Sequence, residues 1–166
     1  NQLTVLRPDE EYKSVLLACA EKLAAAILGD SAAEFEHVLD TVWTVHQLAG
    51  DYNPVHFHNN VKSHFGFSSF LHLQLPPQLN SAQGRFPNRG AKGRHDGVTS
   101  FIWRTDSGLL RDTLECPGTL ECELQEGYLY VFPQWVQHFV WPFQGPGERR
   151  TVAANISLLG PWSRNQ

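Results

Sequence analysis

Gly127-Tyr-Leu-Tyr-Val-Phe-Pro-Gln-Trp-Val-Gln-His138 is the stretch of this 166-residue chain that decides the fold. Its glycine suits a turn, and the apolar and aromatic residues up to Phe132 are typical of a buried β-strand. We expect the strand to end at Pro133, because proline has no backbone N–H to donate. His138 then lies at the start of a second strand, expected over residues 137–141. The stretch predicts consecutive strands with a histidine opening the second.

Similar strand signals recur along the chain. The further candidates are rich in β-branched and aromatic residues and are bounded by turn formers: 42–48, 55–58, 67–75, 98–105, 120–124 and 149–159. Many short strands, with no helices alternating between them, favour a sandwich or jelly roll over a parallel α/β sheet. The fold class we expect is therefore mainly β with N-terminal helices.

The N-terminal part has helical spacing instead. Pro8 and the acidic residues after it suit a helix start, and apolar residues follow at intervals of three and four. Gly29 should end this helix, and Ser31 can cap a short second one. The apolar positions of the second helix would be Phe35, Val38 and Leu39. From Thr41 the period changes to two, so we expect a helical segment over 1–40 that packs on a β core over 41–166.

Composition favours one domain without a nucleic-acid or membrane partner. The net charge is −4, and the basic residues are scattered apart from a loop at 85–94. No apolar run approaches the ~20 residues of a membrane span. The odd cysteines Cys19, Cys116 and Cys122 have no metal-ligand spacing, which favours a reducing, cytoplasmic location. A start at Asn1 without methionine indicates a trimmed piece of a longer product, and the oligomeric state is left open.

The segment from Pro76 to Gly97 differs from the rest of the β region. It has no apolar periodicity and contains Gly84, Gly90 and Gly93. Connections of this length are uncommon unless they are functional, so we expect a lid over a binding site. A solvated basic loop is the alternative.

Three histidines form the first candidate site. His56 and His58 are one residue apart on an expected strand, so their side chains should point to the same face. A remote His138 could complete a three-point grip on one metal ion. A lone His-x-His in a β protein is more often a pair of partly exposed imidazoles. The Arg149-x-Thr151 that follows His138 favours the metal site by combination.

These residues belong to a pattern with fixed order and spacing over roughly residues 41–160: Trp43, Gly50-Asp51, His56-x-His58, Ser68 to Leu73, Pro76, Glu126-Gly127, Phe132-Pro133, His138, Pro142 and Arg149-x-Thr151-x-x-x-Asn155. The pattern resembles the 2-oxoglutarate and Fe(II)-dependent oxygenase family related to prolyl hydroxylases. The resemblance implies a double-stranded β-helix (jelly roll, cupin-like). It also implies Fe(II) as cofactor, with 2-oxoglutarate and O2 as co-substrates.

The resemblance assigns the iron ligands residue by residue. His56 would be the first ligand, His138 the distal ligand, and His58 would take the position that is Asp or Glu in most such oxygenases. Imidazole in place of a carboxylate raises the net charge of the site by one, and three-histidine iron sites occur among β-barrel dioxygenases. A second assignment makes His58 the first ligand and puts Asn60 where the acid should be, but an amide is a poor ligand.

The same resemblance places an arginine on the last core strand. Arg149 and Arg150 point to opposite faces of that strand, and Arg149 shares its face with Thr151. A guanidinium binds a carboxylate bidentately and a hydroxyl can add a bond to the same anion, so Arg149 and Thr151 are expected to hold 2-oxoglutarate. His72 is a further candidate donor to the co-substrate, with a structural histidine as the alternative.

The predicted function is a dioxygenase that hydroxylates a C–H bond of a peptidyl proline, a free amino acid or a small metabolite. One alternative is a three-histidine thiol dioxygenase in which Arg149 would hold the carboxylate of the substrate itself. Another is a catalytically silent jelly-roll binding module. The sequence does not choose the substrate.

Overall fold

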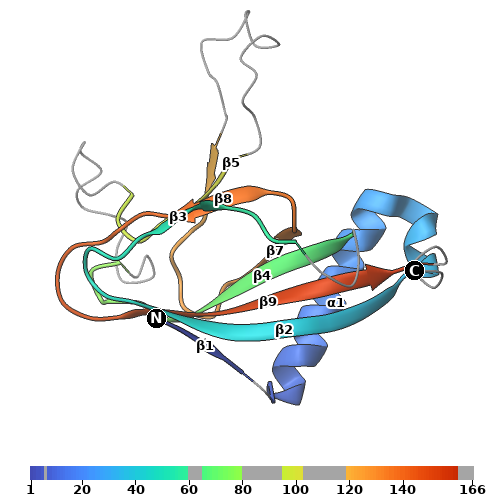
Figure 1. The fold of residues 1–166 in the computed structure, drawn as a ribbon, viewed down its shortest axis with the longest axis horizontal. Helices are drawn as coiled ribbons and strands as arrows, with labels where there is room; N and C mark the ends of the chain where they lie inside the picture. The colour runs from blue at the N-terminus through green and yellow to red at the C-terminus, as the bar shows by residue number, and fades with distance from the viewer. Residues whose placement is uncertain (6, 60–64, 80–94, 103–118, 161–166) are drawn as a thin grey trace, which may run out of the picture.

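The computed structural model describes residues 1–5, 7–59, 65–79, 95–102 and 119–160. The strands form a five-stranded sheet in the order β1-β2-β9-β4-β7 and a four-stranded sheet in the order β3-β8-β5-β6 (Figure 1). In the larger sheet these are β1 (Gln2–Thr4), β2 (Glu36–Gln47), β9 (Arg149–Leu159), β4 (Gly66–Gln74) and β7 (Leu129–Pro133). In the smaller they are β3 (Asn53–His56), β8 (Gln137–Val140), β5 (Thr99–Ile102) and β6 (Thr119–Glu121). All strand pairs are antiparallel, which confirms the mainly β, jelly-roll class.

Strand β9 is the centre of the larger sheet. It pairs with β2 over its whole length and with β4 on its other side. Its bounds are those expected from the sequence, and β7 begins two residues after Gly127, whose φ of 84° is the left-handed conformation that glycine adopts most readily. The turn signal before β7 is thereby confirmed.

The N-terminal helix α1 (Glu10–Leu28) also agrees with the sequence. The Asp9 side chain caps it by accepting hydrogen bonds from the backbone N–H groups of Glu11 and Tyr12 at 3.0 and 3.1 Å. The helix ends at Gly29, which has a φ of 59°. A short 3-10 helix, η1 (Gly29–Glu34), follows.

The expected second helix is wrong beyond Glu34. Phe35 is extended, and Val38 and Leu39 lie in β2, paired with Ser157 and Ile156 of β9. Spacing of three and four residues suggested a helix, but pairing with β9 determines the conformation. Strand β1 was also not expected, and it pairs with the other edge of β2. The division at residue 40 stays a prediction, although β1 and the start of β2 lie on its N-terminal side.

The two faces of the larger sheet pack against different parts of the molecule. One face packs on α1 through a hydrophobic cluster whose buried members include Leu16, Ala20, Ala24, Ala154 and Ile156. The other face turns toward the smaller sheet and contributes Phe70, Phe132 and Ala153 to a second cluster that also contains Phe101 of β5. A jelly roll with one covered face and one interior face follows from this arrangement.

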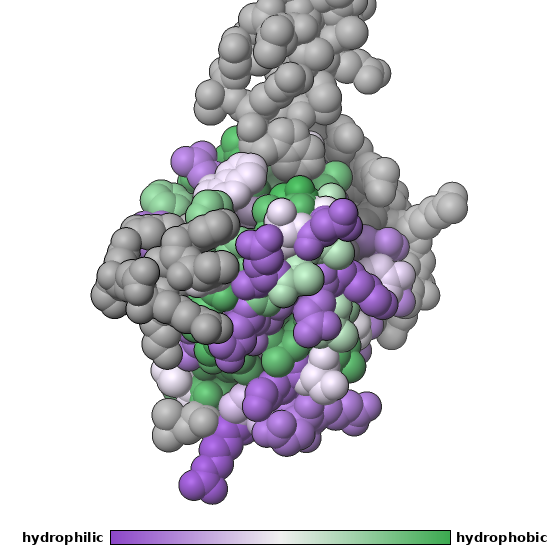
Figure 2. All heavy atoms as spheres, turned by 90° about the vertical axis from the view of Figure 1, so that its right-hand side faces the viewer, coloured by the Kyte–Doolittle hydropathy of each residue, from purple (hydrophilic) through white to green (hydrophobic). Residues whose placement is uncertain are grey.

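The exterior at the end where α1 and β9 finish is mixed in character. Figure 2 shows hydrophilic and hydrophobic side chains interspersed on that side of the molecule. Among the described residues, no helix is long and apolar enough to cross a membrane.

Most of the expected lid lies outside the described residues, because positions 80–94 are among those not described.

Candidate active site

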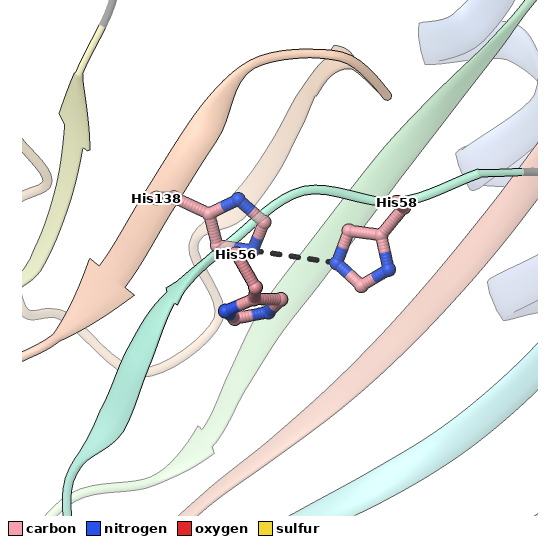
Figure 3. Close-up of side chains that lie close together, drawn as sticks. All are labelled: His56, His58 and His138. Atoms are coloured by element: carbon pink, nitrogen blue, oxygen red, sulfur yellow. Dashed lines mark hydrogen bonds between the residues drawn. The ribbon is translucent and has the colours of Figure 1, made fainter.

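Antiparallel pairing of β3 with β8 brings two of the predicted ligands together. His56, the last residue of β3, is the direct cross-strand partner of His138 on β8, and their ring centroids are 4.3 Å apart. His58 joins them, so that one nitrogen from each of the three histidines lies within 4.8 Å of the others. Figure 3 shows the three rings converging from β3, the segment after it, and β8.

His58 reaches the cluster by a different route from the one expected. Strand β3 ends at His56, so the alternation of side chains on a strand does not place His58. Its backbone N–H instead donates to the Gln134 carbonyl oxygen at 3.0 Å, which ties the segment after β3 to the turn between β7 and β8. The Nε2 atoms of His58 and His138 are then 3.3 Å apart. Asn60, the alternative ligand, lies outside the described residues.

The hydrogen bonds of His56 and His138 use Nδ1 and leave Nε2 of both rings available to a metal ion. His56 Nδ1 donates to the carbonyl oxygen of Pro54 at 2.6 Å, and His138 Nδ1 donates to that of Val136 at 3.1 Å. A metal-bound histidine usually donates its other N–H in this way. Adjacent ligands ~2 Å from one ion are about 3 Å apart, so the spacing of His58 and His138 fits a shared metal ion.

Burial keeps two of these imidazoles neutral. Loss of solvation lowers the pKa of His58 to about 4, with a smaller effect from His56. Loss of solvation also lowers the pKa of His138 to about 4, although its bond to the Val136 carbonyl opposes the shift. Neutral imidazole is the form that binds metal, so both rings are ready to bind a cation at neutral pH.

Arg149 is buried on the interior face of β9. Its Nη1 donates to Gln47 Oε1 at 2.7 Å and its Nη2 donates to Thr99 Oγ1 at 3.0 Å, while Nε has no partner. Burial lowers the pKa of this guanidinium to about 10, so it stays charged at neutral pH. Among the described residues no carboxylate pairs with it. A buried charge without a counterion is costly, so the position favours an anionic ligand.

One cavity of about 290 Å³ connects the arginine with the histidines. Its lining includes His56, His58, His138, Arg149 and Thr151. The expected shared face of Arg149 and Thr151 is therefore seen directly. Arg150 lies on the opposite face and pairs with Glu148 at 2.6 Å, as a charge at the surface would.

His72 does not line this cavity. It lies on β4 beside Thr151 of β9, is fully buried, and has no hydrogen-bond partner on either nitrogen. Burial and the nearby Arg149 charge lower its pKa to about 3. The expected hydrogen bond from His72 to the co-substrate stays a prediction, because this side chain does not line the cavity.

The sequence assigned no role to two lining residues that support Arg149. Gln47 and Thr99 hold the Arg149 guanidinium, and the Trp43 ring lies 5.6 Å from that of His58. Gln47 could have been found from its alternation with Trp43 and Val45 along β2, which puts a polar residue on an interior face. Thr99 carries no such signal.

Fold and site together define a jelly-roll protein with a candidate iron centre. A family model described as "Putative 2OG-Fe(II) oxygenase" matches residues 41–155, and the chain belongs to this family. No curated protein matches it.

Solved structures of this fold are similar at low identity. A prolyl-4-hydroxylase from Pseudomonas putida is 19% identical with a TM-score of 0.54, over 96% of this chain and 72% of that one. EvdO2 from Micromonospora carbonacea var. aurantiaca, complexed with 2-oxoglutarate, is 13% identical with a TM-score of 0.52, over 96% and 68%. A 2OG-Fe(II) family oxidoreductase from Burkholderia pseudomallei is 14% identical with a TM-score of 0.47, over 82% of this chain and 57% of that one. The first two of these structures show the fold, and this chain spans little more than half the length of the third.

Proposed function

We propose that this chain is a 2-oxoglutarate and Fe(II)-dependent dioxygenase that hydroxylates a C–H bond of a small molecule or peptide. The observation that carries the proposal is a buried Arg149 without an acidic partner among the described residues, in the same cavity as three converging histidines. Such a cavity attracts a metal ion at one end and a carboxylate at the other.

In this proposal His56, His58 and His138 hold the iron, which would supply the activation of O2. The residues around it bind, orient and exclude water. Arg149 and Thr151, which both line the cavity, hold the distal carboxylate of 2-oxoglutarate. The overall reaction converts 2-oxoglutarate, O2 and a C–H group into succinate, CO2 and an alcohol.

The histidine at position 58 favours a second candidate. A three-histidine site has one negative charge fewer than a site with two histidines and a carboxylate, and could bind a thiol-bearing substrate directly. Arg149 would then hold the carboxylate of that substrate, and no 2-oxoglutarate would be needed. Both candidates use the same cavity and differ in the ligand that it selects.

Ligand stabilisation separates the candidates. Anaerobic protein with Fe(II) is melted alone, with 2-oxoglutarate, and with cysteine as a carboxylate-bearing thiol. A ligand at 100 times its Kd stabilises by about 2.7 kcal/mol. The proposal predicts a rise in Tm with 2-oxoglutarate, and O2-dependent release of succinate once a substrate is supplied. A rise with cysteine alone supports the thiol dioxygenase, and no response to iron or either ligand indicates a silent binding module.

A further inference from the structure

Gln47 and Arg149 are direct cross-strand partners at the end of β2 and the start of β9. The guanidinium is held from two sheets at once, because its second hydrogen bond goes to Thr99 on β5 of the smaller sheet. The Gln47 and Thr99 side chains are both buried, and each accepts its hydrogen bond from Arg149 through a neutral oxygen. Arginine has only donors, so the amide of Gln47 must present its oxygen to it and keeps its NH2 group as a donor.

We infer that Gln47 is a positioning residue that makes this cavity selective for a carboxylate, because it fixes the arginine without cancelling its charge. The inference rests on the proposed function in one respect, namely that the carboxylate belongs to 2-oxoglutarate.

The identity of the side chain at position 47 decides the charge balance. A glutamate would have nearly the same shape and could accept the same hydrogen bond from Arg149, but it would form a buried ion pair. The arginine would then have its counterion within the protein, and a ligand carboxylate would meet a negative charge 2.7 Å from the guanidinium. None of the described residues that line the cavity is acidic. Because the Gln47 amide is neutral, the guanidinium charge remains available to pair with the carboxylate of a ligand.

A purely structural role makes a different prediction. If Gln47 only supported the strand ends, any change that kept its hydrogen bond would preserve both stability and ligand binding. Under our inference Gln47→Glu separates the two, because it keeps the hydrogen bond and removes the need for an anion. Gln47→Met, neutral and of similar length, is the matched control that loses the hydrogen bond and adds no charge.

The first experiment measures the affinity for 2-oxoglutarate by calorimetry in anaerobic protein with Fe(II). We expect Gln47→Glu to weaken binding by at least ~10-fold at an unchanged or higher Tm, since it adds a counterion to Arg149. We expect Gln47→Met to lower the Tm and to weaken binding less. Gln47→Glu with wild-type affinity would overturn the inference, as would equal loss of binding and of Tm in both variants.

The second experiment needs no ligand. Gln47→Glu is combined with Arg149→Met, and Tm is measured for both single variants and the double variant. We expect the glutamate to lower Tm when Arg149 is absent and not when it is present, because only the arginine can neutralise it. If Gln47→Glu lowered Tm equally with Arg149 present and absent, the inference would be overturned. If the wild type fails to bind 2-oxoglutarate, the proposed function fails, and this cycle still decides the role of Gln47.

Discussion

The two faces of the larger sheet carry opposite kinds of residues although they share the same strands. On β9, Ala154 and Ile156 turn toward α1 and are fully buried in a hydrophobic cluster. Arg149 and Thr151, also on β9, turn inward and line the cavity with the histidines. Both faces are buried, but the helix-covered face packs through an apolar cluster, whereas the interior face combines an apolar cluster with the polar residues of the cavity. The helix-covered face should therefore set stability, while the interior face should set ligand binding.

Ile156→Ala tests the helix-covered face and should have the largest effect on stability. The side chain is fully buried against α1, so its truncation should lower the free energy of unfolding by about 2–5 kcal/mol. Denaturant unfolding measures the change. Below the melting transition, affinities for Fe(II) and 2-oxoglutarate should stay near the wild-type values. A loss of affinity there would show that the two faces are coupled.

His138→Ala is the matching change inside the cavity. Loss of one of three ligands should weaken Fe(II) binding by at least ~100-fold, about 2.7 kcal/mol, while the far-ultraviolet circular dichroism of the fold persists. His37→Ala, at the start of β2, is the control and should leave the affinity unchanged. Iron affinity retained in His138→Ala would remove the three-histidine centre.

His72 should make stability depend on pH. Its pKa is lowered from 6.5 to about 3 in the folded protein, so the unfolded chain binds a proton first as the pH falls. The protein should lose about 1.4 kcal/mol per pH unit from this residue between pH 6.5 and 3, and nothing above that window. His72→Phe should flatten the slope by about one proton. An unchanged slope would contradict the burial of a neutral imidazole at this position.

Adjacent residues on β9 give a direct comparison of its two faces. Arg149→Ala should weaken 2-oxoglutarate binding by at least ~10-fold, about 1.4 kcal/mol, because it removes the buried guanidinium from the cavity. Arg150→Ala should change little, since that side chain pairs with Glu148 outside it. Calorimetry at saturating Fe(II) measures both, and the reverse ranking would refute the assignment.

His58→Asp should have the smallest effect, because it replaces one metal ligand by another. The aspartate supplies the carboxylate that most of the family has at this position, so the variant should retain Fe(II). Its affinity is compared with that of His58→Ala in the same titration. An equal loss in both variants would show that His58 is not a ligand.

The fold could be predicted where local sequence and pairing agree. Strand β9 and the end of α1 at Gly29 follow from alternation and from a glycine, and both are local signals. The start of β2 was missed because Val38 and Leu39 have helical spacing, and only their pairing with β9 makes them a strand. Strand β1 is three exposed residues with no pattern of its own.

The site shows the same limit. Histidine spacing predicted the cluster of His56, His58 and His138, but the mechanism that places His58 is a long-range hydrogen bond to Gln134. The family resemblance predicted an arginine on this strand, and alternation selected Arg149 over Arg150. Its support by Thr99 depends on the approach of the two sheets. Contacts between sheets are set by packing, which no short stretch of sequence records.

The central claim is that one cavity holds Fe(II) and 2-oxoglutarate together, between the three histidines and Arg149. Anaerobic visible spectroscopy tests both ligands in one measurement. Protein with Fe(II) should develop a weak visible charge-transfer band on addition of 2-oxoglutarate, and the band should be lost in His138→Ala and need more 2-oxoglutarate in Arg149→Ala. No band in the wild type at saturating iron and 2-oxoglutarate would contradict the account.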